Sequence, residues 1–199
     1  MSHNKRFATL SAVPLVVVLA IMALAPGALA QSKYKMLYKF TGGADGGAPM
    51  SNLIFDAAGN LYGTTVYGGT HGDGTVFKLT PKQEGAWKES VLYSFCSLSN
   101  CDDGASPNAG VIFDAAGNLY GTTTVGGGDT HGYNGFGTVF KLTPNSNGRW
   151  TETVLHRFYD HPGANPYAGL IFDAAGNLYG TTRGDGFTTF GTVFEIIMP

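Results

Sequence analysis

Charged residues are scarce in this sequence, at 13% of its 199 residues. The lysines and arginines are scattered along the chain, which is unlike a phosphate-binding surface, so we expect no nucleic-acid partner. The sequence also lacks the Gly-x-Ser-x-Gly and His-Glu-x-x-His motifs of serine hydrolases and zinc proteases. We therefore predict no catalytic residues.

Long apolar runs are absent after the first 30 residues. Within those 30, the basic pair Lys5 and Arg6 precedes a mostly apolar stretch at 12–25, and Ala28-Leu29-Ala30 follows. This order is typical of a signal peptide cleaved before Gln31. An uncleaved anchor is the alternative, but the run is short for a span. We expect a secreted, periplasmic or cell-surface protein with no membrane span after cleavage.

Cysteine is limited to Cys96 and Cys101. A structural metal site needs more ligands than two thiols. In an exported chain a close pair of cysteines usually forms a disulfide, and we predict one that closes this loop. A redox-active pair is the alternative.

A repeated segment dominates what is present. Leu-Ile-Phe-Asp-Ala-Ala-Gly-Asn-Leu-Tyr-Gly-Thr-Thr occupies residues 53–65 and returns at 111–123 and 170–182, with only its first residue changed in the second copy. The copies start 58 and 59 residues apart. A fixed period of this size marks a repeat architecture. We expect one mature domain, 31–199, whose abundant glycine indicates many tight turns.

Each copy reads as four short strands, which the first copy illustrates. An apolar strand at 53–56, expected to be buried on both faces, turns at Asp56 into a second strand at 60–65. After a glycine-rich loop, a third strand at 75–80 alternates apolar and polar residues. A fourth strand follows at 87–95. Four antiparallel strands describe one blade of a β-propeller.

The chain ends suggest how the blades close. The last copy stops after its third strand, whereas residues 34–40 match the end of a fourth strand. We therefore predict blade units at 41–95, 96–158 and 159–199, the last completed by the strand at 34–40. Propellers usually have four to eight blades, so two chains could form a six-bladed homodimer. A β-trefoil, which also has three four-stranded units, is an alternative.

The repeated motif, a glycine-rich loop and Gly-Thr-Val-Phe-Lys-Leu-Thr-Pro at 137–144 resemble the GloVer tandem repeat of bacterial choice-of-anchor tandem repeat proteins. The resemblance covers nearly all of residues 34–199. It implies an exported bacterial protein with a propeller-like fold. It implies no particular activity.

The residues that differ between copies are the candidate ligand contacts. They lie in the loops between the second and third strands. Loops on a rigid scaffold concentrate binding residues, so these residues are the ones we expect to contact a ligand. Histidine and aspartate suit metals or polar ligands, and aromatic rings stack on sugars. The candidates are His71, Asp73, Asp129, His131, Asp185, Tyr67, Tyr133, Phe187 and Phe190.

Two hypotheses for function follow from these residues. The first is a non-enzymatic exported module that binds a glycan or a surface protein through these loops, without a cofactor. The second is a metal-dependent lactonase or lyase, in which unlike carboxylate and amide ligands would hold Ca²⁺. The near-identical inner strands offer no such asymmetric ligand set, which favours the binding module.

Overall fold

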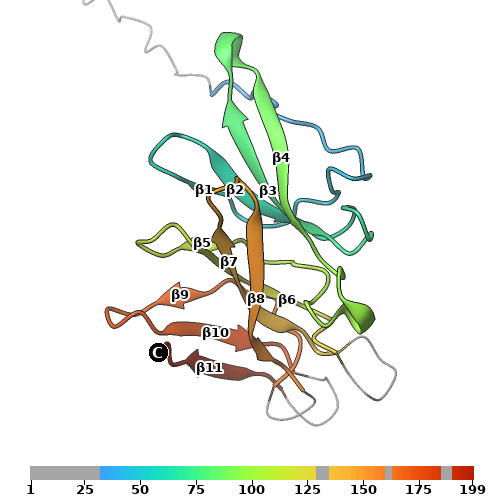
Figure 1. Ribbon diagram of the computed structural model, residues 1–199, viewed down its shortest axis with the longest axis vertical. Coiled ribbons are helices and arrows are strands. Elements are labelled where there is room, and N and C mark those ends of the chain that lie inside the picture. Colours follow the sequence, from blue (N-terminus) through green and yellow to red (C-terminus); the bar gives the residue numbers. More distant parts are fainter. Residues whose placement is uncertain (1–31, 129–134, 160–162, 185–189) are drawn as a thin grey trace, which may run out of the picture. The chain divides into compact units, whose positions relative to one another are not determined.

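The computed structural model describes residues 32–128, 135–159, 163–184 and 190–199 (Figure 1). Met36–Pro199 forms one compact unit, separate from Met1–Lys35. Regular structure in the described residues consists of antiparallel strands and two short 3-10 turns, Gln83–Gly85 and Ser99–Cys101. None of the described helical segments is long and apolar enough to cross a membrane. The predicted all-β class is confirmed.

Eleven strands form three antiparallel sheets, one for each copy of the repeat. Sheet 1 has the order β1-β2-β3-β4, sheet 2 the order β5-β6-β7-β8, and sheet 3 the order β9-β10-β11. The strands are β1 Ile54–Phe55, β2 Leu61–Thr65, β3 Thr75–Pro81, β4 Trp87–Ser94, β5 Ile112–Phe113, β6 Leu119–Thr123, β7 Thr138–Pro144, β8 Trp150–Arg157, β9 Ile171–Phe172, β10 Leu178–Thr182 and β11 Thr192–Ile196.

The two middle strands of each sheet carry the core. In sheet 1 all of β2 is buried, and β3 buries Phe77 and Leu79 while Lys78 between them is half-buried. The predicted alternation of the third strand is thus confirmed. The expectation for the first strand is wrong, because β1 has only two residues and Phe55 is exposed.

The same hydrogen-bonded turn closes the hairpin between the first two strands of each sheet. In sheet 2 the Asp114 carboxylate accepts hydrogen bonds from the Ala116 and Asn118 amides, both at 2.9 Å. It also accepts from Asn118 Nδ2 at 2.7 Å and from the Tyr120 hydroxyl at 3.0 Å. Asp56 and Asp173 make the same set of bonds. The prediction that these aspartates cap turns is confirmed.

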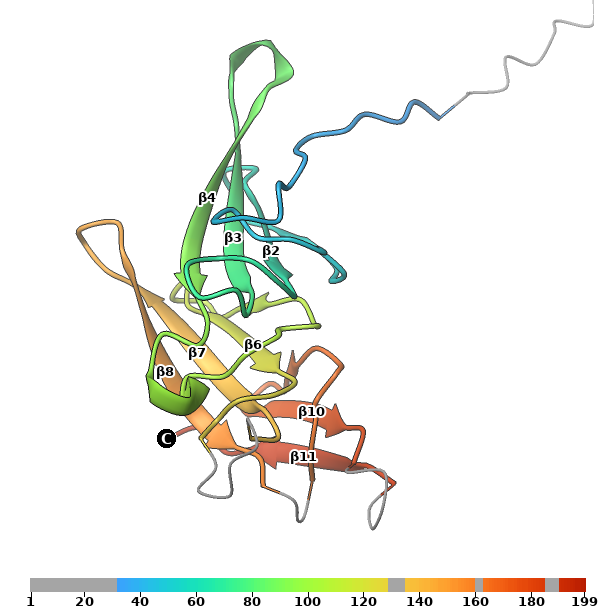
Figure 2. The same ribbon diagram turned by 90° about the vertical axis from the view of Figure 1, so that its right-hand side faces the viewer.

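The three sheets follow one another in chain order (Figure 2). The same contacts join neighbouring sheets at each junction. We call the face of a sheet that meets the following sheet its back face, and the face that meets the preceding sheet its front face. On the back face of sheet 1, Tyr62 packs edge-to-face on Phe113 and Thr64 donates to the Ala109 carbonyl at 2.9 Å. On the back face of sheet 2, Tyr120 packs on Phe172 in the same way. Thr122 there donates to the Ala168 carbonyl at 3.2 Å.

In sheets 1 and 2 the residue after the fourth strand is a phenylalanine that packs on the next sheet. Phe95 packs edge-to-face on Phe140, and Phe158 packs on Phe194. Phe40 packs on Phe77 with the same geometry, and Leu37 and Tyr38 cover the same cluster. Residues 36–40, which we call the N-terminal segment, therefore occupy the position of the end of a preceding sheet's fourth strand.

The predicted closure within one chain is wrong. Residues 34–40 form no strand, and Leu37, Tyr38 and Phe40 pack on the front face of sheet 1, whereas sheet 3 has three strands among the described residues. The physical reason is the side-chain register: Phe40 fits the pocket over Phe77 as its equivalents fit the following sheets. Three sheets related by this packing do not form a closed propeller here.

Candidate functional site

The loop between β2 and β3 holds three of the predicted ligand contacts, Tyr67, His71 and Asp73. Its backbone closes on itself, because the Gly68 amide donates to the Gly72 carbonyl at 3.1 Å and the Gly74 amide donates to the Gly68 carbonyl at 2.9 Å. Gly68 and Gly74 both adopt positive φ, which permits this tight path. The loop is therefore a compact, internally bonded platform.

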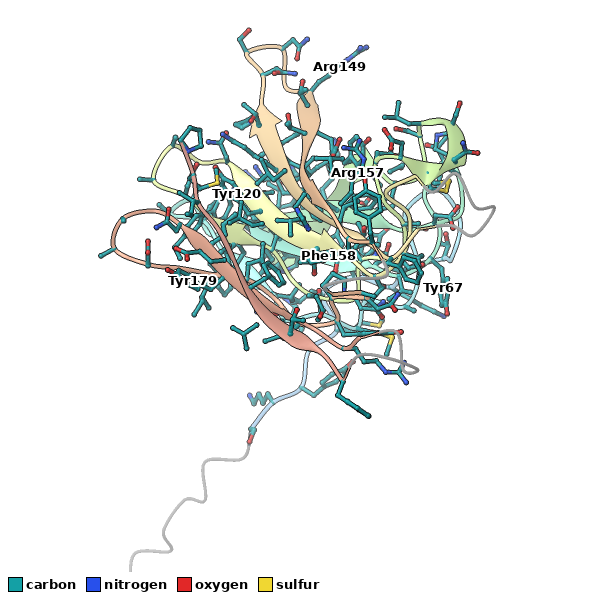
Figure 3. All side chains as sticks on the ribbon, turned by 90° about the horizontal axis from the view of Figure 1, so that it is seen from below. Tyr67, Tyr120, Arg149, Arg157, Phe158 and Tyr179 are labelled. Carbon is teal, nitrogen blue, oxygen red and sulfur yellow. A yellow bond between two sulfur atoms is a disulfide. The ribbon has the colours of Figure 1, made fainter. Side chains whose placement is uncertain are left out.

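Tyr67 stands out from this platform. Its side chain is 61% exposed, while its backbone pairs with Gly47 through two hydrogen bonds of 2.8 and 3.1 Å. The equivalent position in sheet 2 is Val125, whose backbone pairs with Ala105 in the same way. In sheet 3 it is Gly184. The frame repeats, but only sheet 1 places an exposed aromatic ring on it (Figure 3).

His71 and Asp73 point to different environments. His71 is exposed, whereas Asp73 is half-buried beside the disulfide between Cys96 and Cys101. One carboxylate oxygen of Asp73 lies within 4.8 Å of both sulfurs. Because the two sulfurs are bonded to each other, they cannot act as thiolate ligands, and this trio is not a metal site. The predicted disulfide is confirmed.

The other predicted contacts belong to the equivalent loops of the second and third copies of the repeat. Asp129, His131, Tyr133, Asp185 and Phe187 lie outside the residues that the structure describes. Phe190 is described and its side chain is fully exposed. The structure therefore gives the geometry of the sheet 1 loop, and ligand binding by any of the three loops stays a prediction.

A polar cluster near the disulfide was not anticipated from the sequence. Asp103 is completely buried, and its carboxylate accepts hydrogen bonds from the Tyr93 hydroxyl at 2.7 Å, the Ser97 hydroxyl at 2.7 Å and the Ser97 amide at 2.8 Å. The Leu98 amide adds a fourth at 3.2 Å. A related cluster joins Tyr38, Thr41 and Asp45 beside the N-terminal segment, but that cluster is more exposed.

A glutamate lies beside each of these clusters. Burial and the nearby Asp103 carboxylate raise the pKa of Glu152 to about 7, and Arg157 partly opposes that rise. Burial and Asp45 raise the pKa of Glu89 to about 7. One oxygen of each glutamate is buried without a hydrogen-bond partner. The signal in the sequence was a glutamate two residues after each of the two tryptophans.

These clusters repeat, so they are part of the scaffold. A carboxylic acid with a pKa near 7 can transfer protons in catalysis. Here, however, equivalent glutamates occupy equivalent strands in sheets 1 and 2, and they interact electrostatically with the equivalent tyrosines Tyr38 and Tyr93. Among the described residues neither glutamate is joined by a nucleophile. Repetition at matching positions favours a packing role over catalysis.

Comparison with known proteins agrees with the repeat. The sequence pattern of the family described as the Gloeobacter/Verrucomicrobia repeat matches residues 23–198. A comparison with curated proteins finds no match. The matched region contains all three sheets, including each Asp-capped hairpin and each junction between sheets. This chain is a member of the Gloeobacter/Verrucomicrobia repeat family.

Proposed function

We propose that this protein is an exported, non-enzymatic repeat module that binds a glycan through the loop between β2 and β3. The observation that carries the proposal is Tyr67, an exposed ring on a backbone held by two hydrogen bonds. A tyrosine loses little conformational entropy on binding, and its face stacks on the apolar face of a sugar ring. The exposed imidazole of His71 on the same loop adds a polar contact.

Export is part of the proposal. The basic pair Lys5 and Arg6, the apolar run and Ala28-Leu29-Ala30 have the order of a signal peptide. A disulfide between Cys96 and Cys101 is typical of an oxidising compartment such as the periplasm or the exterior. A surface protein is the alternative partner, because an exposed tyrosine also suits a protein interface.

Glycan arrays probed with the purified protein test the proposal. We expect binding that falls at least tenfold in Tyr67→Val, the residue that sheet 2 carries at this position. Tyr167→Asn is the matched control, because it gives an exposed tyrosine of sheet 3 the residue of sheet 2. No binding at high protein concentration, or equal loss in both variants, would contradict the proposal.

The competing function is a metal-dependent lactonase or lyase. Elemental analysis of the purified protein separates the two. We expect no stoichiometric divalent metal. Bound metal that is lost in His71→Ala would favour the enzyme instead.

A further inference from the structure

The back face of sheet 3 is bare where the same face of the other sheets is covered. Val193 is 81% exposed, while its equivalents Val76 and Val139 are completely buried. Thr181 is exposed, whereas its equivalent Thr64 is buried and bonds to the next sheet. This face has the residues of an interface, and nothing in the described part of the chain covers it.

The part of the front face of sheet 1 that the N-terminal segment leaves uncovered is the complementary surface. Leu53 is 45% exposed, although its equivalents Val111 and Leu170 are buried. Phe55 is 66% exposed, whereas its equivalent Phe113 packs on the preceding sheet. The two bare faces are thus the two halves of the junction that already joins sheet 1 to sheet 2.

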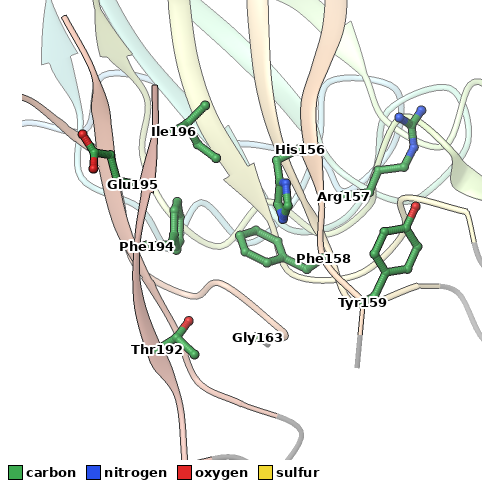
Figure 4. A pocket seen from close by; sticks show the side chains of 9 residues that line it. All are labelled: His156, Arg157, Phe158, Tyr159, Gly163, Thr192, Phe194, Glu195 and Ile196. Carbon is green, nitrogen blue, oxygen red and sulfur yellow. The ribbon is translucent and has the colours of Figure 1, made fainter. Parts of the chain in front are cut away.

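The outer edge of sheet 3 is also unpaired. The strands β3 and β7 pair on both sides, whereas β11 pairs only with β10 among the described strands. Beside this edge lies a groove with Phe158 and His156 on one side and Phe194 and Ile196 on the other (Figure 4). In Figure 4 the Phe194 and Ile196 side chains point toward Phe158 and His156, and Glu195 points away. Such an edge is a template for an added strand.

Residues 36–40 match the end of a fourth strand. Met36 is exposed and occupies the position of Val91 in β4. Its neighbours Leu37 and Phe40 already lie on the front face of sheet 1, as the end of β4 lies on sheet 2. These residues are therefore placed where an edge strand brought against sheet 1 would meet them.

We propose that sheet 3 of one copy docks on sheet 1 of a second copy, and that residues 34–40 of the second copy become the fourth strand of the first copy's sheet 3. The register follows from sheets 1 and 2, where Val76 pairs with Tyr93 and Val139 with His156. It pairs Val193 with Tyr38 and places Met36 in the groove over Phe194.

Charge supports this register. In sheets 1 and 2 the third strand carries Lys78 and Lys141, which pair with Ser90 and Thr153. In β11 the equivalent residue is the exposed Glu195, and the register sets it opposite a lysine, Lys35. Opposite charges directly across two strands stabilise the pairing by roughly 0.2–1 kcal/mol.

The same junction used twice closes a ring of two copies. Each copy offers one front face and one back face, so a pair of copies buries both and leaves no open edge. The ring has six sheets, two copies of three, which lies within the usual range for propellers. This inference goes beyond glycan binding, because it does not use the loop of Tyr67.

Light scattering on the full chain tests the inference. We expect twice the chain mass, and a single chain mass for Val193→Asp at concentrations where the parent chain is paired. Because Val193 is exposed within one copy, the aspartate leaves each copy folded, which circular dichroism checks. Leu98→Asp, an exposed leucine in the disulfide loop, is the matched control and stays paired. A single chain mass for the parent, a ladder of larger masses, or a Val193→Asp variant that stays paired would overturn it.

Discussion

At the scale of single residues, two aspartates hold a hairpin turn and the disulfide loop in place through hydrogen bonds. Asp114 joins four donors around one hairpin, and Asp103 joins four around the disulfide loop. Hydrogen bonds to a charged acceptor are the stronger ones, and losing the acceptor leaves its donors unpaired. Both aspartates therefore belong to the scaffold.

Replacing Asp114 with alanine should lower the free energy of unfolding by about 2 kcal/mol, because its four donors lose a charged acceptor. Urea titration with an unchanged m value measures this loss. The equivalent Asp173→Ala should cost less, because that hairpin is more exposed and its tyrosine has a second partner in Glu195. An equal loss in both variants would show that burial does not decide the effect.

Glu152 predicts a pH dependence of stability. Its pKa is about 7 in the fold against about 4.5 when unfolded, so the folded state holds more protons between these values. The free energy of unfolding should therefore decrease as the pH rises from 5 to 8. Thermal unfolding of Glu152→Gln should show a weaker decrease and a higher melting temperature at pH 8.

Two other groups shape that profile. Glu89 contributes a decrease of the same sign, so Glu89→Gln should weaken it independently. Burial lowers the pKa of His156, which opposes the decrease below pH 6.5 because the neutral ring is favoured in the fold. A profile that rises from pH 7 to pH 8 in the parent chain would contradict this account.

At the scale of elements, each sheet depends on a glycine beneath an aromatic ring. A Cβ on Gly121 would lie 2.6 Å from Cζ of Phe140, one on Gly63 would lie 2.9 Å from Cζ of Phe77, and one on Gly180 would lie closer still to Cζ of Phe194. The glycine in the second strand is therefore needed for the ring of the third strand to lie flat on the sheet.

Gly121→Ala should destabilise the protein by about 1–3 kcal/mol through overpacking. Adding Phe140→Leu should recover part of that loss, because the smaller side chain leaves room for the new methyl group. Chemical denaturation of the two single variants and the double variant gives the coupling between the positions. Additive losses would mean that the glycine serves another purpose.

Much of each element was readable from the sequence. The hairpin turn at Asp56, the alternation around Phe77 and the disulfide at Cys96 all follow from local patterns, and the structure has them. The sequence predicted a first strand at 53–56, but β1 has only two residues. An apolar run indicates burial and does not indicate how many residues pair with a neighbouring strand. The Asp103 cluster was missed because its donors come from a loop whose path depends on the disulfide.

At the scale of the whole molecule, the repeat explains both what is packed and what is bare. Each sheet offers one face to the sheet before it and one to the sheet after it, and within the described residues the back face of sheet 3 and part of the front face of sheet 1 are exposed. The position of residues 34–40 could not be read from the sequence, because similarity to a fourth strand does not say which sheet that strand accompanies. Packing of Phe40 on Phe77 decides it.

The disulfide ties the first junction to the loop that carries Tyr67. Closing a loop of this size stabilises a fold by about 2 kcal/mol. Replacing both Cys96 and Cys101 with serine should therefore lower the free energy of unfolding by about that amount. It should also weaken any ligand bound at Tyr67, since Asp73 in the same loop lies beside the sulfurs. Unchanged stability would show that the bond is not needed for this loop.

The most direct test of the repeat-based account is a disulfide between two copies. A chain with Val193→Cys and Tyr38→Cys should form a covalent pair on mild oxidation, seen as doubled mass on a non-reducing gel, because those positions face each other in the proposed register. Each single variant should remain uncoupled. Absence of a covalent pair, or a bond formed within one chain, would contradict the docking of sheet 3 on sheet 1 of a second copy.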